Sequence, residues 1–268
     1  MAVRESVGLI DMTSFAKYRV QGRDAEAVLN QICANDVAVE PGRIVYTPWL
    51  NERGGIEADL TVTRLAEDDY LVVTSAGSQV RDFHWLQNHI PGDAHAIATD
   101  VTSGYAVLAV MGPRARDVLQ PLTSTDLSNE AFPFASSQMI EMGYAHVRAS
   151  RITYVGELGW ELYVPTEFAA GIYEALLEGG GDAGLVHVGM HAVNSLRMEK
   201  AYRHWGHDIT DEETPLQGGL GFAVAWDKPS GFIGKEALLR LRENANRKRL
   251  VQFVLQDPEP LLYHNEPV

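Results

Sequence analysis

Strand-like and helix-like patterns follow one another along this chain without a regular strand–helix–strand rhythm. The clearest strand pattern covers residues 56–63, where apolar and polar residues alternate, so that the apolar side chains share one face. A helical pattern precedes it at residues 23–32, and residues 105–111 form an apolar run. Such an irregular order favours an α+β fold over a doubly wound parallel sheet.

The same patterns, together with the turn residues between them, predict the remaining elements. Further strands are expected at residues 43–50, 70–74, 144–154, 160–164, 220–226 and 250–255. Further helices are expected at residues 78–90, 114–119, 168–177, 190–202 and 235–243.

Composition excludes several classes of protein. With 268 residues, 46% of them hydrophobic, the chain is long enough for a large core in one domain or two fused ones. No apolar run approaches the ~18 residues of a spanning helix, so we expect no membrane partner. The net charge of −14 argues against nucleic acid as a general partner. The N-terminus lacks the order of a signal peptide, which predicts a cytoplasmic location.

Basic residues gather in one stretch of this acidic chain. Residues 228–249 hold seven basic and two acidic side chains. The stretch reads either as a solvated helix face or as a local attractor for an anionic ligand.

Three other patterns are expected to be structural. Residues 179–184 match G-x-G-x-x-G, but a helix precedes them, so we expect a glycine-rich helix end and not a dinucleotide site. The single cysteine, Cys33, ends an apolar helix and is expected to be a small buried residue. The histidines show no metal-binding spacing, so we expect no metal.

Two acidic residues in the strand at 56–63 are candidates for chemistry. Glu57 and Asp59 are two positions apart, so both carboxylates lie on one face. They read equally as a solvated outer face or as a carboxylate in a pocket, where burial tunes it for proton transfer.

A second candidate site follows a turn at residues 155–159. Glu161 and Tyr163 share one face of the strand after that turn, and Tyr154 precedes it. A carboxylate accepts two parallel N–H bonds from a guanidine-like edge, and tyrosine rings can cover a flat heterocycle. The alternative is an ordinary hairpin.

Four stretches taken together resemble a known family. Residues 54–60, 110–115, 154–161 and 214–220 resemble the tetrahydrofolate-binding aminomethyltransferase family, whose best-known member is the glycine cleavage T protein. The resemblance implies that family's α+β folate-binding fold. It further implies a folate domain over residues 1–245 and the start of a C-terminal β domain over 246–268, with most of that β domain absent.

Two more stretches resemble one branch of the family. Residues 127–134 and 199–206 are similar to the folate domain of sarcosine and dimethylglycine dehydrogenases. This implies capture of the methyl-derived carbon of an N-methylglycine by tetrahydrofolate as 5,10-methylenetetrahydrofolate. FAD would act only through a domain outside this chain, which would be a partner. The alternatives are a T-protein-like aminomethyltransferase, a folate-dependent demethylase or a folate-binding module without chemistry.

The resemblance also assigns roles to single residues. Asp59 matches the family's catalytic aspartate, and Glu161 the glutamate that binds the pterin edge. Tyr154 matches a folate-contacting tyrosine, and Phe222 falls near an aromatic position of the folate pocket. The arginine that the T protein carries just before its Asp-Ser-Leu stretch corresponds to Val193, which leaves recognition of the folate tail open.

Overall fold

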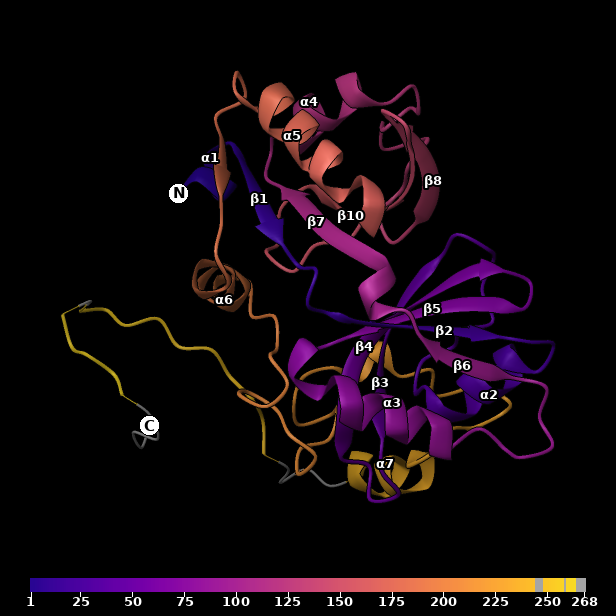
Figure 1. The fold of residues 1–268 in the computed structure, drawn as a ribbon. Helices are drawn as coiled ribbons and strands as arrows, with labels where there is room; N and C mark the ends of the chain where they lie inside the picture. Colours follow the sequence, from indigo (N-terminus) through magenta and orange to yellow (C-terminus); the bar gives the residue numbers. More distant parts are fainter. Residues whose placement is uncertain (244–247, 258, 264–268) are drawn as a thin grey trace.

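A computed structural model describes residues 1–243, 248–257 and 259–263. Two sheets with helices packed against them form its body, so the predicted α+β fold is confirmed (Figure 1). The helices are α1 (Ala2–Glu5), α2 (Ala25–Ile32), α3 (Gln79–Asn88), α4 (Ala115–Leu119), α5 (Ala169–Gly180), α6 (Met190–Glu199) and α7 (Lys235–Arg242).

The first sheet has six strands in the order β11-β1-β7-β10-β9-β8. All neighbouring pairs are antiparallel except β1 and β11, which are parallel. The strands are β1 (Val7–Asp11), β7 (Tyr105–Met111), β8 (Ser137–Met142), β9 (Ala145–Ser150), β10 (Gly159–Pro165) and β11 (Leu185–His187).

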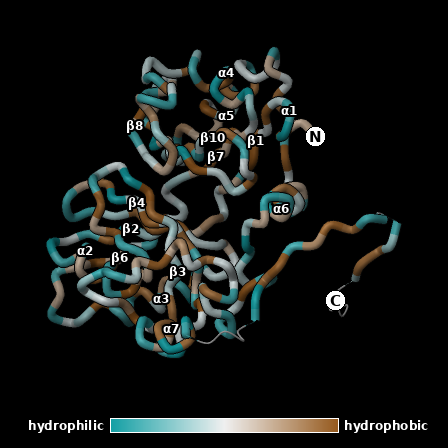
Figure 2. Tube along the Cα trace, turned by 180° about the vertical axis from the view of Figure 1, so that it is seen from behind, coloured by the Kyte–Doolittle hydropathy of each residue, from teal (hydrophilic) through white to brown (hydrophobic). Residues whose placement is uncertain are grey.

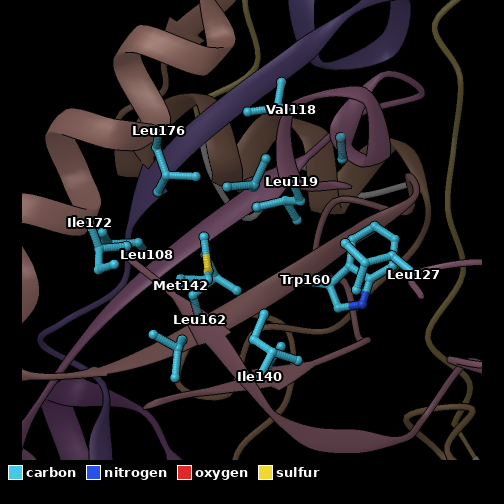
Figure 3. Close-up of a cluster of buried hydrophobic side chains, with 14 of the residues drawn as sticks. Leu108, Val118, Leu119, Leu127, Ile140, Met142, Trp160, Leu162, Ile172 and Leu176 are labelled. Atoms are coloured by element: carbon cyan, nitrogen blue, oxygen red, sulfur yellow. The ribbon is translucent and has the colours of Figure 1, made fainter. Parts of the chain in front are cut away.

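Helices α4 and α5 cover one face of the six-stranded sheet. Figure 3 shows the core beneath them, where Leu176 of α5 and Val118 of α4 meet Leu108 and Leu162 of the strands. Trp160 is fully buried there and packs edge-on against Phe132, with ring centroids 6.0 Å apart. Burial of these side chains stabilises β10, the strand that carries Glu161 on its other face.

The second sheet has five strands in the order β3-β4-β5-β2-β6, all antiparallel. Its strands are β2 (Ala16–Gln21), β3 (Ile44–Leu50), β4 (Ile56–Ala66), β5 (Asp69–Thr74) and β6 (Ile97–Asp100). The predicted alternation in β4 is confirmed: Ala58, Leu60 and Val62 are buried in the core that α2 and α3 cover. The acidic residues of β4 therefore face away from this core.

The two sheets meet through the faces opposite to these cores. Ala109 of β7 and Tyr163 of β10 belong to a buried cluster with Leu71 of β5 and Leu196 of α6. Residues on these facing surfaces come from distant parts of the sequence. At this junction β10 therefore packs against the five-stranded sheet.

Two predicted strands are wrong. Residues 220–226 form a short 3-10 helix, Gly221–Ala223, because turn hydrogen bonds hold this segment while Leu220 and Val224 pack into a buried cluster. Residues 250–255 form no strand, because no strand among the described residues lies beside them to pair with them. Figure 2 shows this apolar stretch running clear of both sheets. The predicted domain boundary at residue 245 lies outside the described residues.

The basic stretch does not act as one surface. Lys228 is buried, and its ammonium donates to the carbonyls of Asn30 at 2.7 Å, Cys33 at 2.5 Å and Asn35 at 2.8 Å. Lys228 therefore ties two segments of the core together. Arg247 lies outside the described residues. Cys33 itself is buried, as predicted.

Within the described ranges, no helix is both long enough and apolar enough to cross a membrane.

Candidate functional site

The strand register places four side chains in one row across the five-stranded sheet. Lys17 of β2 lies opposite Val73 of β5, Val73 opposite Thr61 of β4, and Thr61 opposite Tyr46 of β3. Residues directly opposite in antiparallel strands share a face. The row therefore lies on the face toward the six-stranded sheet, and it is about 14 Å long because three strand gaps of about 4.8 Å separate its ends.

Asp59 lies at the Tyr46 end of this row. It precedes Thr61 by two positions on β4 and so shares its face. The Tyr46 hydroxyl donates a hydrogen bond of 2.9 Å to Asp59 Oδ2. Tyr46 was not predicted as a site residue, because nothing in its local sequence singles it out. Its hydrogen bond to Asp59 identifies it in the structure.

Burial raises the pKa of Asp59 to about 6, although the hydrogen bond from Tyr46 opposes the shift. The negative charges of Asp82 and Asp208 raise the pKa further. A carboxyl group that changes protonation close to neutral pH is suited to accept and return a proton. The pocket reading of Asp59 is therefore favoured over a solvated face.

Glu57, the other acidic residue on this face, has a different environment. Its carboxylate accepts hydrogen bonds from Asn51 Nδ2 at 3.1 Å and from Arg81 Nη2 at 2.5 Å. Arg81 also stacks over Trp205, 4.3 Å from the ring centroid. The charge of Glu57 is thus balanced by a cation, whereas the hydrogen bond to Asp59 comes from a neutral hydroxyl.

We predict that Glu57→Gln lowers the free energy of unfolding by less than about 1 kcal/mol, because partly exposed ion pairs contribute little. Urea unfolding would measure this change. Any reaction in which Asp59 takes part should proceed in the variant as in the wild type, since Asp59 is untouched. A loss of activity comparable to that of an Asp59 variant would show that the wrong carboxylate has been assigned.

Tyr154 lies near the same end of the row. Its hydroxyl donates to the carbonyl of Arg203 at 2.6 Å, and its ring stacks on Tyr202 with centroids 6.3 Å apart. Burial raises the pKa of Tyr154 above its usual range, and the charge of Asp59 adds to the shift. This electrostatic interaction indicates that Tyr154 lies in the neighbourhood of Asp59.

The turn after Tyr154 depends on a glycine. Gly156 has a φ of +73°, a backbone conformation that side chains disfavour. A Cβ atom at this position would also lie 2.5 Å from Cγ of Lys200. Gly156 therefore allows the close approach that leads the chain into β10.

Glu161 and Tyr163 lie on β10 in the junction between the sheets. Glu161 is only 6% exposed, and its carboxylate Oε2 accepts a hydrogen bond of 2.8 Å from the Tyr163 hydroxyl. Burial raises the pKa of Glu161 to about 7, while the Tyr163 hydrogen bond and the charge of Lys17 oppose the shift. Glu161 is thus associated with the Lys17 end of the row.

Phe222 lies on the segment wrongly predicted as a strand, yet it joins the site. Its ring stacks on Tyr46 with centroids 6.1 Å apart and planes 24° apart, and the side chain is 75% exposed. Phe222 and Asp59 therefore both contact Tyr46. The structure brings Asp59, Tyr154 and Phe222 to one end of the site and Glu161 and Tyr163 to the other.

The two arginines near the site are engaged in internal contacts. Arg197 is buried, with hydrogen bonds to Asn194 at 2.8 Å and to Asp208. Arg203 donates to the carbonyl of Gly218 at 2.6 Å and to that of Ala201. Both side chains therefore brace the loop that follows α6.

The histidines nearby do not form a metal-binding group. His204 and His207 have ring centroids 4.4 Å apart, and burial lowers the pKa of His204. In the part of the chain that the structure describes, no three His, Cys, Asp or Glu side chains gather so as to hold a metal ion.

The structure thus places a half-buried aspartate and a buried glutamate along the junction of two facing sheets. A family model described as the GCVT N-terminal domain matches residues 1–228, and the chain belongs to this family. The resemblance seen in the sequence is thereby confirmed.

The solved structures agree with this assignment. The crystal structure of glycine cleavage system aminomethyltransferase T from Bartonella henselae matches with a TM-score of 0.78 and 30% sequence identity. The match covers 89% of this chain and 63% of that one.

Curated relatives include both longer enzymes and a shorter one. The chain is 42% identical to 4-methylaminobutanoate oxidase (formaldehyde-forming) of Paenarthrobacter nicotinovorans, covering all of this chain and 32% of that protein. It is 37% identical to mitochondrial dimethylglycine dehydrogenase of Rattus norvegicus, covering 96% and 30%. It is 37% identical to the aminomethyltransferase of Halothermothrix orenii, covering 95% and 70%. The chain thus spans about a third of the length of the two longer relatives.

Proposed function

We propose that this chain binds tetrahydrofolate and transfers to it a one-carbon unit derived from the methyl group of an N-methylated glycine. The observation that carries the proposal is the pair of carboxylates along the sheet junction, with Asp59 at one end and Glu161 at the other. Both have pKa values raised by burial, which is typical of functional groups.

The side chains of the site fit a reduced pterin. A carboxylate has about four lone-pair positions, so Glu161 can keep its bond from Tyr163 and still accept two N–H bonds from a pterin edge. Tyr154 and Phe222 offer aromatic faces near Asp59, and the exposed Phe222 marks the open side. These groups would orient a flat ring so that its reactive nitrogens lie near Asp59.

The reaction needs a group that handles protons. When formaldehyde condenses with two N–H groups of tetrahydrofolate, two C–N bonds form, two protons leave the nitrogens and the oxygen departs as water. Asp59 would accept a proton as each nitrogen attacks and return it to the departing oxygen. The Tyr46 hydroxyl holds the carboxylate in place through its bond to Oδ2.

The carbon source is proposed from the names of the relatives. One relative is called a formaldehyde-forming oxidase and another a dimethylglycine dehydrogenase, both names that denote oxidation of methylated amines. Oxidation of this kind calls for a redox cofactor, and we propose that FAD in a separate domain supplies it. That domain would pass the released carbon to the Asp59 end of the site.

A second candidate is a T-protein-like aminomethyltransferase that takes its carbon from a lipoyl carrier. The aminomethyltransferase of Halothermothrix orenii and the solved T protein favour it. The two candidates differ in the donor but share the folate site. A folate-binding module without chemistry would have the same site and no turnover.

Turnover with a free donor separates these candidates. We expect the chain to form 5,10-methylenetetrahydrofolate from tetrahydrofolate and formaldehyde faster than the uncatalysed reaction. Activity only with an aminomethylated lipoyl donor would favour the T-protein reading. If the chain binds folate but accelerates product formation from neither donor, its function is that of a folate-binding module without chemistry.

A further inference from the structure

Two arginines meet at one side-chain oxygen beside the six-stranded sheet. Arg116 of α4 and Arg151, which follows β9, both donate to Asn129 Oδ1, at 2.8 and 2.7 Å. Their guanidinium carbons also lie over the ring of Trp160, 5.7 and 5.6 Å from its centroid. Trp160 packs into the core beneath α4 and α5 (Figure 3), so this cluster lies on the face of β10 opposite to Glu161.

In the described part of the chain, the acceptors of these guanidinium groups are neutral. Arg116 Nε donates to the carbonyl of Leu127 at 2.7 Å, and Arg151 Nη1 to the carbonyl of Phe132 at 2.5 Å. The third acceptor is the shared amide oxygen of Asn129. Such oxygens, and an aromatic ring, attract a guanidinium group but carry no net charge. The contacts therefore hold the loop that contains Asn129, but they do not balance the two positive charges.

The nearby carboxylates do not supply the missing negative charge. Asp117, next to Arg116 in the sequence, pairs instead with Arg114 at 3.1 Å. The charge of Glu130 acts on Arg151, but Glu130 is exposed, so water screens it. Burial lowers the pKa of Arg151, and the charge of Arg116 lowers it further. Two like charges thus lie close together, and neither forms an ion pair with a described residue.

Two buried N–H groups of the same cluster have no acceptor. They are Arg151 Nε and Trp160 Nε1, and among the described residues no other side chain has a buried nitrogen or oxygen without a hydrogen-bond partner. Trp160 is fully buried. A buried donor without an acceptor costs free energy, and in native proteins it calls for an explanation such as a bound ion. The unbalanced charges and the unsatisfied donors therefore call for the same group, an acceptor that carries negative charge.

The number of free donors indicates the class of anion. A guanidinium group has five N–H donors in a planar fork, and the described contacts use two in each arginine. A carboxylate has two oxygens in one plane and matches one such fork. A phosphate group has at least three strong acceptor oxygens that point in different directions. Two forks that start from different elements therefore fit a phosphate group better than a carboxylate.

We propose that Arg116, Arg151 and Asn129 form a phosphate-binding site, at which a phosphate ion or a phosphate ester bridges the two guanidinium groups. Because Trp160 and Glu161 point to opposite faces of β10, this inference goes beyond the proposed folate function and does not depend on it. Residues 127–134, one of the stretches that resemble the dehydrogenase branch, form the loop of the site. The exposed Asn129 marks the side from which the anion would enter.

Inorganic phosphate is the probe, and sodium chloride keeps the ionic strength constant because salt screens surface charges. The readout is the indole N–H signal of Trp160 in nitrogen-15 NMR, identified among the five tryptophans by its loss in Trp160→Phe. This signal should shift saturably, with a dissociation constant on the order of 1 mM or below. Methyl phosphate in a second titration distinguishes the two sources: tighter binding than inorganic phosphate indicates an ester, and weaker binding indicates the free ion.

Removing either arginine should weaken the binding of phosphate. Arg116→Met and Arg151→Met should each raise the dissociation constant at least about ten-fold, because each removes one of two charge-assisted donor groups. Arg23→Met is the matched control, since it removes an exposed arginine that precedes α2 and should leave the dissociation constant unchanged.

Asn129→Asp keeps the inference testable if an arginine variant fails to fold. It places a carboxylate where both guanidinium groups donate, so it should raise the melting temperature and weaken phosphate binding at least about ten-fold. Absence of a saturable shift up to roughly 50 mM phosphate, or an equal shift with sodium acetate, would overturn the inference. A shift that persists unchanged in Asn129→Asp and in a folded arginine variant would place the phosphate elsewhere and would also overturn it.

Discussion

Replacing Asp59 with asparagine should lower the rate of 5,10-methylenetetrahydrofolate formation by about 10²- to 10³-fold, the usual contribution of a positioned acid–base group. Tetrahydrofolate binding should change by less than about three-fold, because asparagine can still accept the Tyr46 hydrogen bond. The measurement is product formation from tetrahydrofolate and formaldehyde, with the uncatalysed rate subtracted. Glu57→Gln, on the same face of β4, is the matched control.

The pH dependence of the wild-type rate gives an independent check on Asp59. The raised pKa of about 6 means that the carboxyl is protonated below pH 6 and ionised above it. A base must be ionised, so the rate at saturating tetrahydrofolate, where protonation of Glu161 does not limit binding, should fall as pH drops through about 6. Full activity in the Asp59→Asn variant, or a fall in rate that persists there, would show that another group transfers the proton.

Replacing Glu161 with alanine should weaken tetrahydrofolate binding by at least about 100-fold, because two hydrogen bonds to a charged group contribute about 1.5–3 kcal/mol each. Calorimetry would measure the dissociation constant. Glu161→Gln preserves the volume but not the charge, and should fall between the wild type and Glu161→Ala. Glu141→Ala, on β8 of the same sheet, removes an exposed carboxylate and serves as the control.

Unchanged binding in Glu161→Ala would contradict the pterin assignment of this glutamate. Equal weakening in Glu141→Ala would point to a loss of general charge and not to a specific contact. Circular dichroism of each variant would confirm that the fold persists. If the Glu161→Ala protein is folded, the loss of affinity results from the missing contact between Glu161 and the pterin.

Sequence patterns predicted both a strand with one face in a core, β4, and a strand buried on both faces, β7. The alternation around Leu60 and the apolar run around Ala109 both coincide with strands of the structure. They predicted poorly where packing overrides local preference. Residues 220–226 have strand-like apolar spacing, but turn hydrogen bonds and burial of Leu220 and Val224 hold them in a loop.

Parts of the site depend on register, which a single sequence does not show. Lys17 and Arg19 make β2 look like a polar segment in the sequence. In the structure both residues lie on the face of the sheet that points toward the junction. Tyr46 reaches Asp59 only because β3 and β4 pair with Tyr46 opposite Thr61. The family resemblance predicted Asp59, Tyr154 and Glu161 as site residues, whereas Tyr46 was identified only from its hydrogen bond to Asp59 in the paired strands.

Calorimetric titration of the wild-type chain with tetrahydrofolate under anaerobic conditions tests the central proposal most directly. Two hydrogen bonds to a buried carboxylate and stacking on aromatic rings predict one saturable site with a dissociation constant on the order of micromolar. Absence of saturable binding up to roughly 1 mM tetrahydrofolate would contradict the proposed function.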